Sequence, residues 1–258
     1  MTPEERRNNI LDLVRTEGRA SVEQLADSLD ISRETIRRDL TELDRRGFLR
    51  KVHGGAVVAE PYAGDTGEGP FAARMTENLA AKRAIAKAAA ALLKPGDSLF
   101  IDTGSTTLMF AEELPALQGL TVITNSAAIA ALAAKGEESR VFLIGGEFRR
   151  GGQECVGDMA VQHIGQFRAM HAFLTVAAVA ATGYMDHDLQ EAQIARAMSR
   201  QAGKVTILAD SSKMDRVGVF EIVPASASSR LIADSIPSNL ARQLTAAGVE
   251  IIIATATK

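Results

Sequence analysis

Three segments near the amino end carry apolar residues at helical spacing. These residues are Ile10, Leu11, Leu13 and Val14, then Leu25, Ala26 and Leu29, and last Ile36, Leu40 and Leu43. Capping boxes over residues 2–5 and 21–24, and a Ser at position 32, predict where the three helices begin. A glycine follows the first and third segments, as helix ends often require. Residues 48–52 then predict a strand and Gly54-Gly55 a tight turn. Three helices followed by a two-stranded wing form a winged helix-turn-helix.

From residue 80 onward, continuous apolar segments alternate with helical ones. The pattern predicts helices over 80–93, 106–114, 126–134, 157–164, 190–201 and 238–247, and strands over 98–101, 120–124, 140–144, 172–178, 205–209, 231–233 and 249–254. This alternation is typical of an α/β domain with a mostly parallel sheet covered on both faces. Residues 59–70 are rich in Gly, Pro and acid, as linkers are. We therefore expect a winged domain over 1–58, a linker over 59–70 and an α/β domain over 71–258.

The third helix has a charged face opposite its apolar stripe. At about 100° per residue, Glu34, Arg38 and Thr41 fall on that face, and Thr35 and Arg37 flank it. Residues 31–55 contain seven Lys or Arg against four Asp or Glu, a local charge of +3, whereas the whole chain carries −3. The bland alternative is a charged three-helix module with a solvated face. The fixed order of caps, helices and wing favours DNA contact over that alternative.

Polar motifs follow four of the predicted strands. They lie at residues 102–107, 124–126, 145–146 and 210–213. Because parallel strands end at one edge, where open α/β sheets bind ligands, these motifs predict a single site. The loop over 102–107 offers small residues, hydroxyls and helix N-terminal amides, which suit a phosphate, and Lys213 would add a positive charge. Taken singly, each motif has a structural alternative: a capped turn, an αL turn at Asn125, a chain bend at 145–146, and a favourable first-turn acid at Glu191.

The run ISRETIRRDLTELDRRGFLRKVHGGA, residues 31–56, resembles the N-terminal domain of the DeoR family of bacterial transcriptional regulators. That family has a Ser-x-x-Thr-Ile-Arg-Arg-Asp-Leu helix followed by a Leu-x-Arg-x-His-Gly-Gly-Ala wing. The resemblance implies DNA-contacting positions on the recognition helix and wing, namely Ser32, Arg33, Thr35, Arg37, Arg38, Arg50, His53, Gly54 and Gly55. Asp39 lies beside the buried stripe, so we expect it to pair with a nearby arginine.

The second half is similar to the DeoR-type sensor domain, which has the ribose-phosphate isomerase and CoA-transferase fold. The landmark motifs are Asp-x-Gly-Ser-Thr-Thr, Thr-Asn-Ser, Gly-Gly and Ala-Asp-Ser-Ser-Lys. The resemblance implies sensing of a phosphorylated sugar or related metabolite through Asp102, Gly104, Ser105, Thr106, Thr107, Asn125, Glu191 and Lys213. Two departures put the usual effector geometry in question: Met170 replaces a common Asp, and residues 175–181 are bulkier than the usual Gly-rich turn.

These observations predict a cytoplasmic repressor of a carbohydrate-metabolism operon, not an enzyme, that binds operator DNA as a homo-oligomer and is released by a sugar phosphate. A helix over residues 71–93 is the expected coupling element. One rival is a sugar-phosphate isomerase-like enzyme with an accessory DNA-binding module, using Asp102, Glu191, Asp210 and Lys213. Another is a regulator whose sensor no longer binds ligand.

Several classes of protein are disfavoured by composition and motif spacing. The lone Cys155 excludes a disulfide framework and suits a reducing cytosol. The histidines lack the spacing of a metal site, so we expect no metal and no cofactor. Neither a signal-peptide core nor an apolar run of about 20 residues is present, so we expect no membrane contact.

Overall fold

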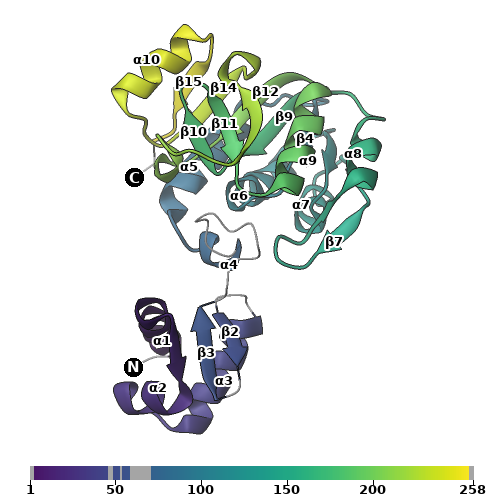
Figure 1. The fold of residues 1–258 in the computed structure, drawn as a ribbon. Helices are drawn as coiled ribbons and strands as arrows, with labels where there is room; N and C mark the ends of the chain where they lie inside the picture. Colours follow the sequence, from purple (N-terminus) through teal and green to yellow (C-terminus); the bar gives the residue numbers. More distant parts are fainter. Residues whose placement is uncertain (1–2, 46–48, 53, 59–70, 256–258) are drawn as a thin grey trace. The chain divides into compact units, whose positions relative to one another are not determined.

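The computed structural model describes residues 3–45, 49–52, 54–58 and 71–255 (Figure 1). The predicted linker and His53 lie outside these residues, and the Arg50 side chain is likewise not described. Contacts divide the chain into two compact units, one over Met1–Asp65 with Gly69–Arg74 and one over Met75–Lys258 with Thr66–Glu68.

The first unit contains the three expected helices, α1 (Pro3–Glu17), α2 (Val22–Leu29) and α3 (Arg33–Arg45). Ser21 caps α2 through the predicted capping box with Gln24. The backbone amide of Gln24 donates to the Ser21 hydroxyl at 3.1 Å. The predicted stripe of α3 is buried, with Ile36 and Leu40 fully inaccessible. The helical periodicity of the sequence therefore identified the core of this unit.

The wing of the first unit has three strands, not the two that were expected. Strands β2 (Leu49–Val52) and β3 (Gly55–Val58) form the hairpin, and β1 (Arg19–Ser21) pairs with β3 in the order β1-β3-β2. A Cβ at Gly55 would lie 2.2 Å from the carbonyl oxygen of Ala20. Position 55 therefore accepts only glycine, because β1 runs directly against it.

The second unit is built on a seven-stranded parallel sheet in the order β15-β14-β12-β9-β4-β5-β6. Its strands are β4 (Ser98–Ile101), β5 (Thr121–Thr124), β6 (Arg140–Leu143), β9 (Ala169–Thr175), β12 (Ala202–Leu208), β14 (Arg230–Ala233) and β15 (Glu250–Ile253). Its longer helices are α5 (Leu79–Ala90), α6 (Ser105–Glu113), α7 (Ala127–Ala133), α8 (Asp158–Ile164), α9 (Leu189–Arg200) and α10 (Ser238–Ala246). The α/β fold class is confirmed.

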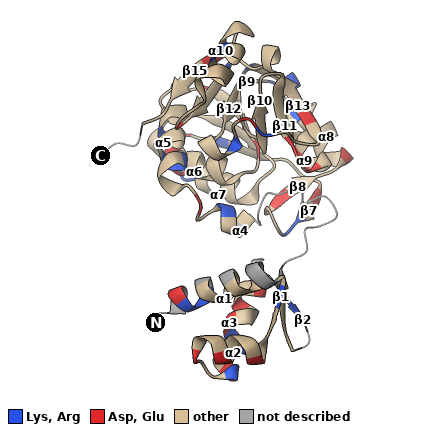
Figure 2. Cartoon of the chain, turned by 60° about the vertical axis from the view of Figure 1, so that its left-hand side comes forward, with Lys and Arg blue, Asp and Glu red and all other residues tan. Residues whose placement is uncertain are grey.

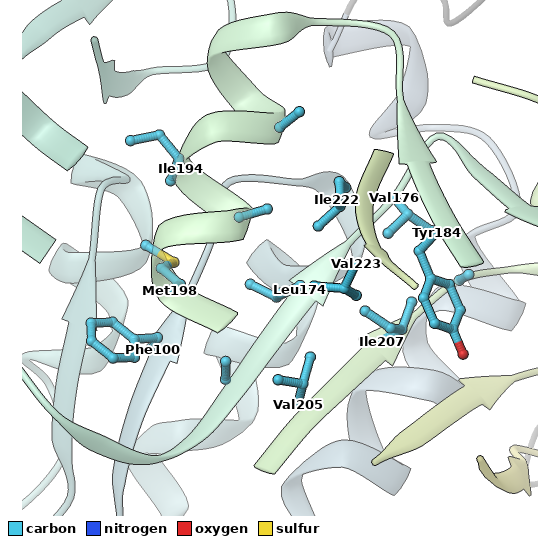
Figure 3. Packing of buried hydrophobic residues seen from close by; sticks show 14 of the residues in the cluster. Phe100, Leu174, Val176, Tyr184, Ile194, Met198, Val205, Ile207, Ile222 and Val223 are labelled. Carbon is cyan, nitrogen blue, oxygen red and sulfur yellow. The ribbon is translucent and has the colours of Figure 1, made fainter. Parts of the chain in front are cut away.

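Two apolar cores cover the two faces of this sheet. Alternate residues of β4 point to opposite faces, so Leu99 and Ile101 join the core under α5, α6 and α7, while Phe100 joins the core under α8, α9 and α10. Figure 3 shows the core under α8, α9 and α10, where Met198 of α9 lies beside Phe100 of β4. Because both faces are covered, the strands are continuous apolar runs rather than alternating ones.

Several segments differ from the expected elements. The coupling helix predicted over 71–93 is divided, because α4 (Phe71–Arg74) and α5 are separated by a turn in which Asn78 has φ of 53°. A small antiparallel sheet, β10 (Ala178–Ala180), β11 (Gly183–Asp186) and β13 (Phe220–Pro224), was not predicted. Neither was the hairpin of β7 (Glu147–Arg149) and β8 (Glu154–Val156).

Candidate functional site: a basic recognition helix and an acidic pocket

The exposed face of α3 carries three arginines, two of which pair with Glu34. The side chains of Arg33, Arg37 and Arg38 are 60%, 59% and 80% exposed. Glu34 contacts Arg38 at 3.6 Å and Arg37 at 4.0 Å, and Glu23 of α2 contacts Arg33 at 3.4 Å. Exposed pairs of this kind contribute little to stability, so the arginines remain able to exchange these acids for phosphate. Figure 2 shows where charge of either sign falls along the chain.

The amino end of α3 is fixed by hydroxyl groups. The Ser32 hydroxyl accepts the Thr35 amide at 3.3 Å and lies 2.9 Å from the Thr35 hydroxyl. These two predicted DNA-contacting residues thus cap the helix. Gly54 adopts φ of +85°, which favours glycine at the tip of the wing. From the wing, the Lys51 ammonium donates to the Thr41 hydroxyl of α3 at 2.7 Å.

Asp39 holds α1 against α3, as a structural partner of arginine. Its carboxylate is 3% exposed and accepts from Nε of Arg6 at 2.5 Å and Nε of Arg7 at 3.0 Å. The Asp39 hydrogen bond raises the pKa of Arg6 above its ordinary value. The expectation that Asp39 pairs with nearby arginine is confirmed, and the two arginines come from α1.

The candidate effector site of the second unit lies where the strand order reverses. The chain runs from β4 outward through β5 and β6, and then from β9 outward in the other direction. At this point the Asp102 carboxylate, just after β4, accepts the Thr175 amide at the end of β9 at 2.9 Å. Such topological switch points are where open α/β sheets bind ligands.

A pocket opens at this switch point. It is lined by Asp102, Thr103, Asn125, Glu154, Thr175, Asp186, Glu191, Ile194 and Ala195. Three predicted effector residues, Asp102, Asn125 and Glu191, are therefore brought together. The Asn125 side chain links the loop after β4 to β8 (Glu154–Val156), since its amino group donates to the Cys155 carbonyl at 3.0 Å and its oxygen accepts from the Thr103 hydroxyl at 3.3 Å.

The amino end of α6 lies directly after Thr103. Its N-cap is Gly104, which supplies no side-chain hydrogen bond to the first turn. A Cβ at Gly104 would lie 2.2 Å from the Thr175 hydroxyl, so the loop packs closely on β9. The side chains of Ser105 and Thr106 are buried, and among the residues that the structure describes their hydroxyls have no hydrogen-bond partner. Uncapped amides with adjacent hydroxyls suit an anion. The Thr107 hydroxyl is instead bonded to the Gly104 carbonyl at 3.1 Å.

One arginine on the β7–β8 hairpin joins three carboxylates beside the pocket. Arg149 donates to Glu154 at 2.6 Å, to Asp188 at 2.7 Å and to Glu191 at 2.7 Å. Glu154 is 1% exposed, so this guanidinium is the charge that compensates it. Figure 2 shows charge of both signs on this hairpin. Asp188 also caps α9, accepting the Glu191 amide at 3.0 Å.

Burial dominates the electrostatics of the pocket. It raises the pKa of Asp102 well above the ordinary value, against the hydrogen bond from the Thr175 amide. Burial also raises the pKa of Glu154, with the Arg149 charge opposing it. The pKa of Asp188 is lowered by hydrogen bonds from the Glu191 amide and Arg149, which outweigh its burial. The acids of this site therefore differ in pKa: those of Asp102 and Glu154 are raised, and that of Asp188 is lowered.

Not every predicted effector residue reaches the pocket. Lys213 lies in a short 3-10 turn, η2 (Ser211–Lys213), and is absent from the pocket lining. Burial lowers the pKa of Lys213 to about 8. Met170 is the second residue of β9, where its backbone amide donates to the Ser98 hydroxyl, at the opposite end of the strand from Thr175, and it is 53% exposed. The departure at Met170 therefore does not alter the pocket.

Three polar pocket residues, Glu154, Thr175 and Asp186, and the adjoining Arg149 are not among the predicted effector residues, and Thr103 lies within the predicted loop over 102–107 without being named as a contact. In the segment over 145–156 the sequence pattern predicts only a glycine turn at 145–146. Its polar and apolar alternation on either side of Gly151-Gly152 is the signal of a hairpin.

In the part of the chain that the structure describes, no group of His, Cys, Asp or Glu is arranged to hold a metal ion. Over the same part, no helix has the length and apolar character needed to cross a membrane.

This combination of a winged helix-turn-helix and an α/β domain with a pocket at its switch point is that of a DNA-binding transcriptional regulator. Two family models match the chain, the DeoR-like helix-turn-helix domain over residues 6–62 and the DeoR C terminal sensor domain over residues 77–235. The chain belongs to the DeoR family.

Curated relatives match the chain along nearly all its length. It is 31% identical to the transcriptional repressor AccR of Agrobacterium fabrum, over 95% of this chain and 97% of that protein. It is 32% identical to the glycerol-3-phosphate regulon repressor of Haemophilus influenzae, over 93% and 92%. Among solved structures, ribose 5-phosphate isomerase A from Methanocaldococcus jannaschii matches 52% of this chain and 53% of its own, at 21% identity and a TM-score of 0.38.

Proposed function

We propose that this protein represses a carbohydrate-metabolism operon and that a phosphorylated sugar or related metabolite releases it from operator DNA. The observation that carries the effector class is the amino end of α6, where the Gly104 N-cap supplies no side-chain hydrogen bond and the small hydroxyl residues Ser105 and Thr106 lie beside the uncapped amides. The repressor role follows the relatives, two of which are named repressors. The protein acts in the cytoplasm as a homo-oligomer whose recognition helices engage two operator half-sites.

In the complex with DNA, α3 enters the major groove, and the side chains of Arg33, Arg37 and Arg38 face the DNA. Arginine at this position contributes phosphate contacts and bidentate reading of guanine. The wing, with Arg50, His53 and Gly54, contacts the adjacent backbone.

The DNA-binding half is tested by replacing Arg38. A bound sequence is first selected from random DNA, and affinity is then followed by fluorescence anisotropy. Arg38→Ala is expected to weaken specific binding by about tenfold or more, while Arg242→Ala, an exposed arginine of α10, retains wild-type affinity. If Arg38→Ala binds the selected DNA as tightly as the wild type, the proposal that α3 contacts DNA is wrong.

The effector half is tested on the same complex. Sugar phosphates are screened for release of the DNA, and the active compound is then applied to Thr106→Val, which removes one hydroxyl at nearly constant volume. Loss of a hydrogen bond to a charged group weakens binding by about 10- to 100-fold, whereas the exposed Thr245→Val on α10 should match wild type. Equal response of both variants would place the phosphate elsewhere, and chemical turnover of the compound would support the enzyme alternative.

A further inference from the structure

The pocket beside α6 has far more negative than positive charge. Asp102, Glu154, Asp186 and Glu191 line it, and Asp188 adjoins them through Arg149. Arg149 is the one guanidinium in this group, and four of its N–H groups already donate to Glu154, Asp188 and Glu191. A phosphate placed among these carboxylates would meet strong repulsion, so the anion belongs at the α6 amides and not in the pocket.

The pocket also has more hydrogen-bond acceptors than donors to offer to a ligand. Its side-chain donors are committed to the protein: the Thr103 hydroxyl donates to Asn125, the Asn125 amide to the Cys155 carbonyl, and the Thr175 hydroxyl to Asp102 or the Thr103 carbonyl. At least one acceptor remains available to a ligand. The Oε2 atom of Glu154 is buried and receives no hydrogen bond of good geometry, although the Thr103 hydroxyl is near enough to lower the pKa of that carboxyl.

An entering group must therefore donate and need not accept. A hydroxyl donates one hydrogen bond and has two lone pairs that accept them, whereas an ammonium donates three hydrogen bonds and accepts none. An ammonium also reduces the excess of buried negative charge, which a neutral hydroxyl cannot do. The space open to the centre of a water-sized group is about 10 Å³, close to the least that holds one water, so the pocket has room for one small group of the size of an ammonium.

We propose that this acidic pocket binds a protonated amine, and that the effector is a phosphorylated amine, such as an amino sugar phosphate, with its phosphate on the α6 amino end. This inference rests on the proposed function, because it names the ligand class of the same sensor site. Thr103 lines the pocket and directly precedes the Gly104 N-cap, so the two subsites are contiguous.

The test compares ligands that differ only in one group. Calorimetric titration of the full-length protein uses three matched pairs: glucosamine 6-phosphate and glucose 6-phosphate, galactosamine 6-phosphate and galactose 6-phosphate, and phosphoethanolamine and 2-hydroxyethyl phosphate. In at least one pair the amine should bind about tenfold or more tightly than its hydroxyl counterpart. Equal or tighter binding of the hydroxyl compounds in every pair would overturn the inference and leave the proposed function standing. Binding of none of the six would count against both.

A variant and a pH profile separate the amine contact from general stability. Asp102→Asn keeps an oxygen to accept the Thr175 amide but removes a charge, so it should reduce the amine preference within a pair. Glu112→Gln, an exposed acid of α6, should preserve it. The phosphate of every ligand takes up its second proton near about pH 6, so the amine contact is judged by the difference within a pair. Because the ammonium requires ionised carboxylates, the amine should release more protons on binding, and gain more affinity from pH 5 to pH 7, than its hydroxyl counterpart. If Asp102→Asn unfolds, this difference in the wild type decides alone, and equal pH dependence of the two compounds in every pair overturns the inference.

Discussion

Removing Arg149 tests how the β7–β8 hairpin and the pocket are held together. Arg149→Ala leaves Glu154 nearly fully buried without its compensating charge, while Asp188 and Glu191, 40% and 26% exposed, remain hydrated. Breaking a buried ion pair by deleting one partner costs about 3–5 kcal/mol. Since two of the three partners reach solvent, we expect about 3 kcal/mol. For a domain of this size that lowers the melting temperature by roughly 6–12 °C.

Differential scanning calorimetry of four variants measures this loss. Arg149→Ala is compared with Glu154→Gln, with the double variant, and with Arg150→Ala, the adjacent and exposed arginine. The double variant should be more stable than Arg149→Ala, because the neutral amide needs no cation. The loss in Arg149→Ala should also shrink toward pH 5, where Glu154, whose pKa is raised by burial, takes up a proton more readily. Equal melting of Arg149→Ala and Arg150→Ala, or strictly additive effects, would refute the ion-pair account.

Three further substitutions have defined outcomes. Gly55→Val should destabilise the winged unit and abolish its DNA binding, because a Cβ there would lie 2.2 Å from the Ala20 carbonyl oxygen, and circular dichroism melting of that unit measures the loss. Lys213 has a pKa lowered to about 8 in the fold, so the unfolded chain binds more protons above pH 8 and stability should rise from there toward about pH 10; Lys213→Met should flatten that rise in urea titrations. Asp102 has its pKa raised by burial, so stability should fall as pH rises above about 4, and Asp102→Asn should lack this fall and be more stable at pH 7.

The parts of the fold that depend on local pattern were predictable. The buried stripe of α3 follows from periodicity, and the strands β4, β5 and β6 are continuous apolar runs. Strand β1 was missed because it has three residues, with no alternation to detect, and exists only through pairing with β3. The division of the segment over 71–93 into α4 and α5 depends on the left-handed Asn78, which helical periodicity does not reveal.

The candidate site was predicted where its residues follow strands of the parallel sheet. Asp102 and Asn125 were found in this way, because parallel strands end at one edge. Arg149 and Glu154 were not, since they come from a hairpin that folds back over that edge. Lys213 follows β12, which ends on the same edge, but its short turn does not line the pocket, so its contact with an effector stays a prediction. Sequence position fixes the edge of the sheet and not the direction of a side chain.

The central claim is that effector and operator oppose each other through one protein. It is tested by measuring operator affinity with and without saturating effector, and effector affinity with and without saturating operator, under one set of conditions. Binding linkage requires the two factors to be equal, and typical couplings are about 5- to 150-fold. We predict that each ligand weakens the other by the same factor within that range. Operator affinity that stays the same when the effector site is filled would contradict the account.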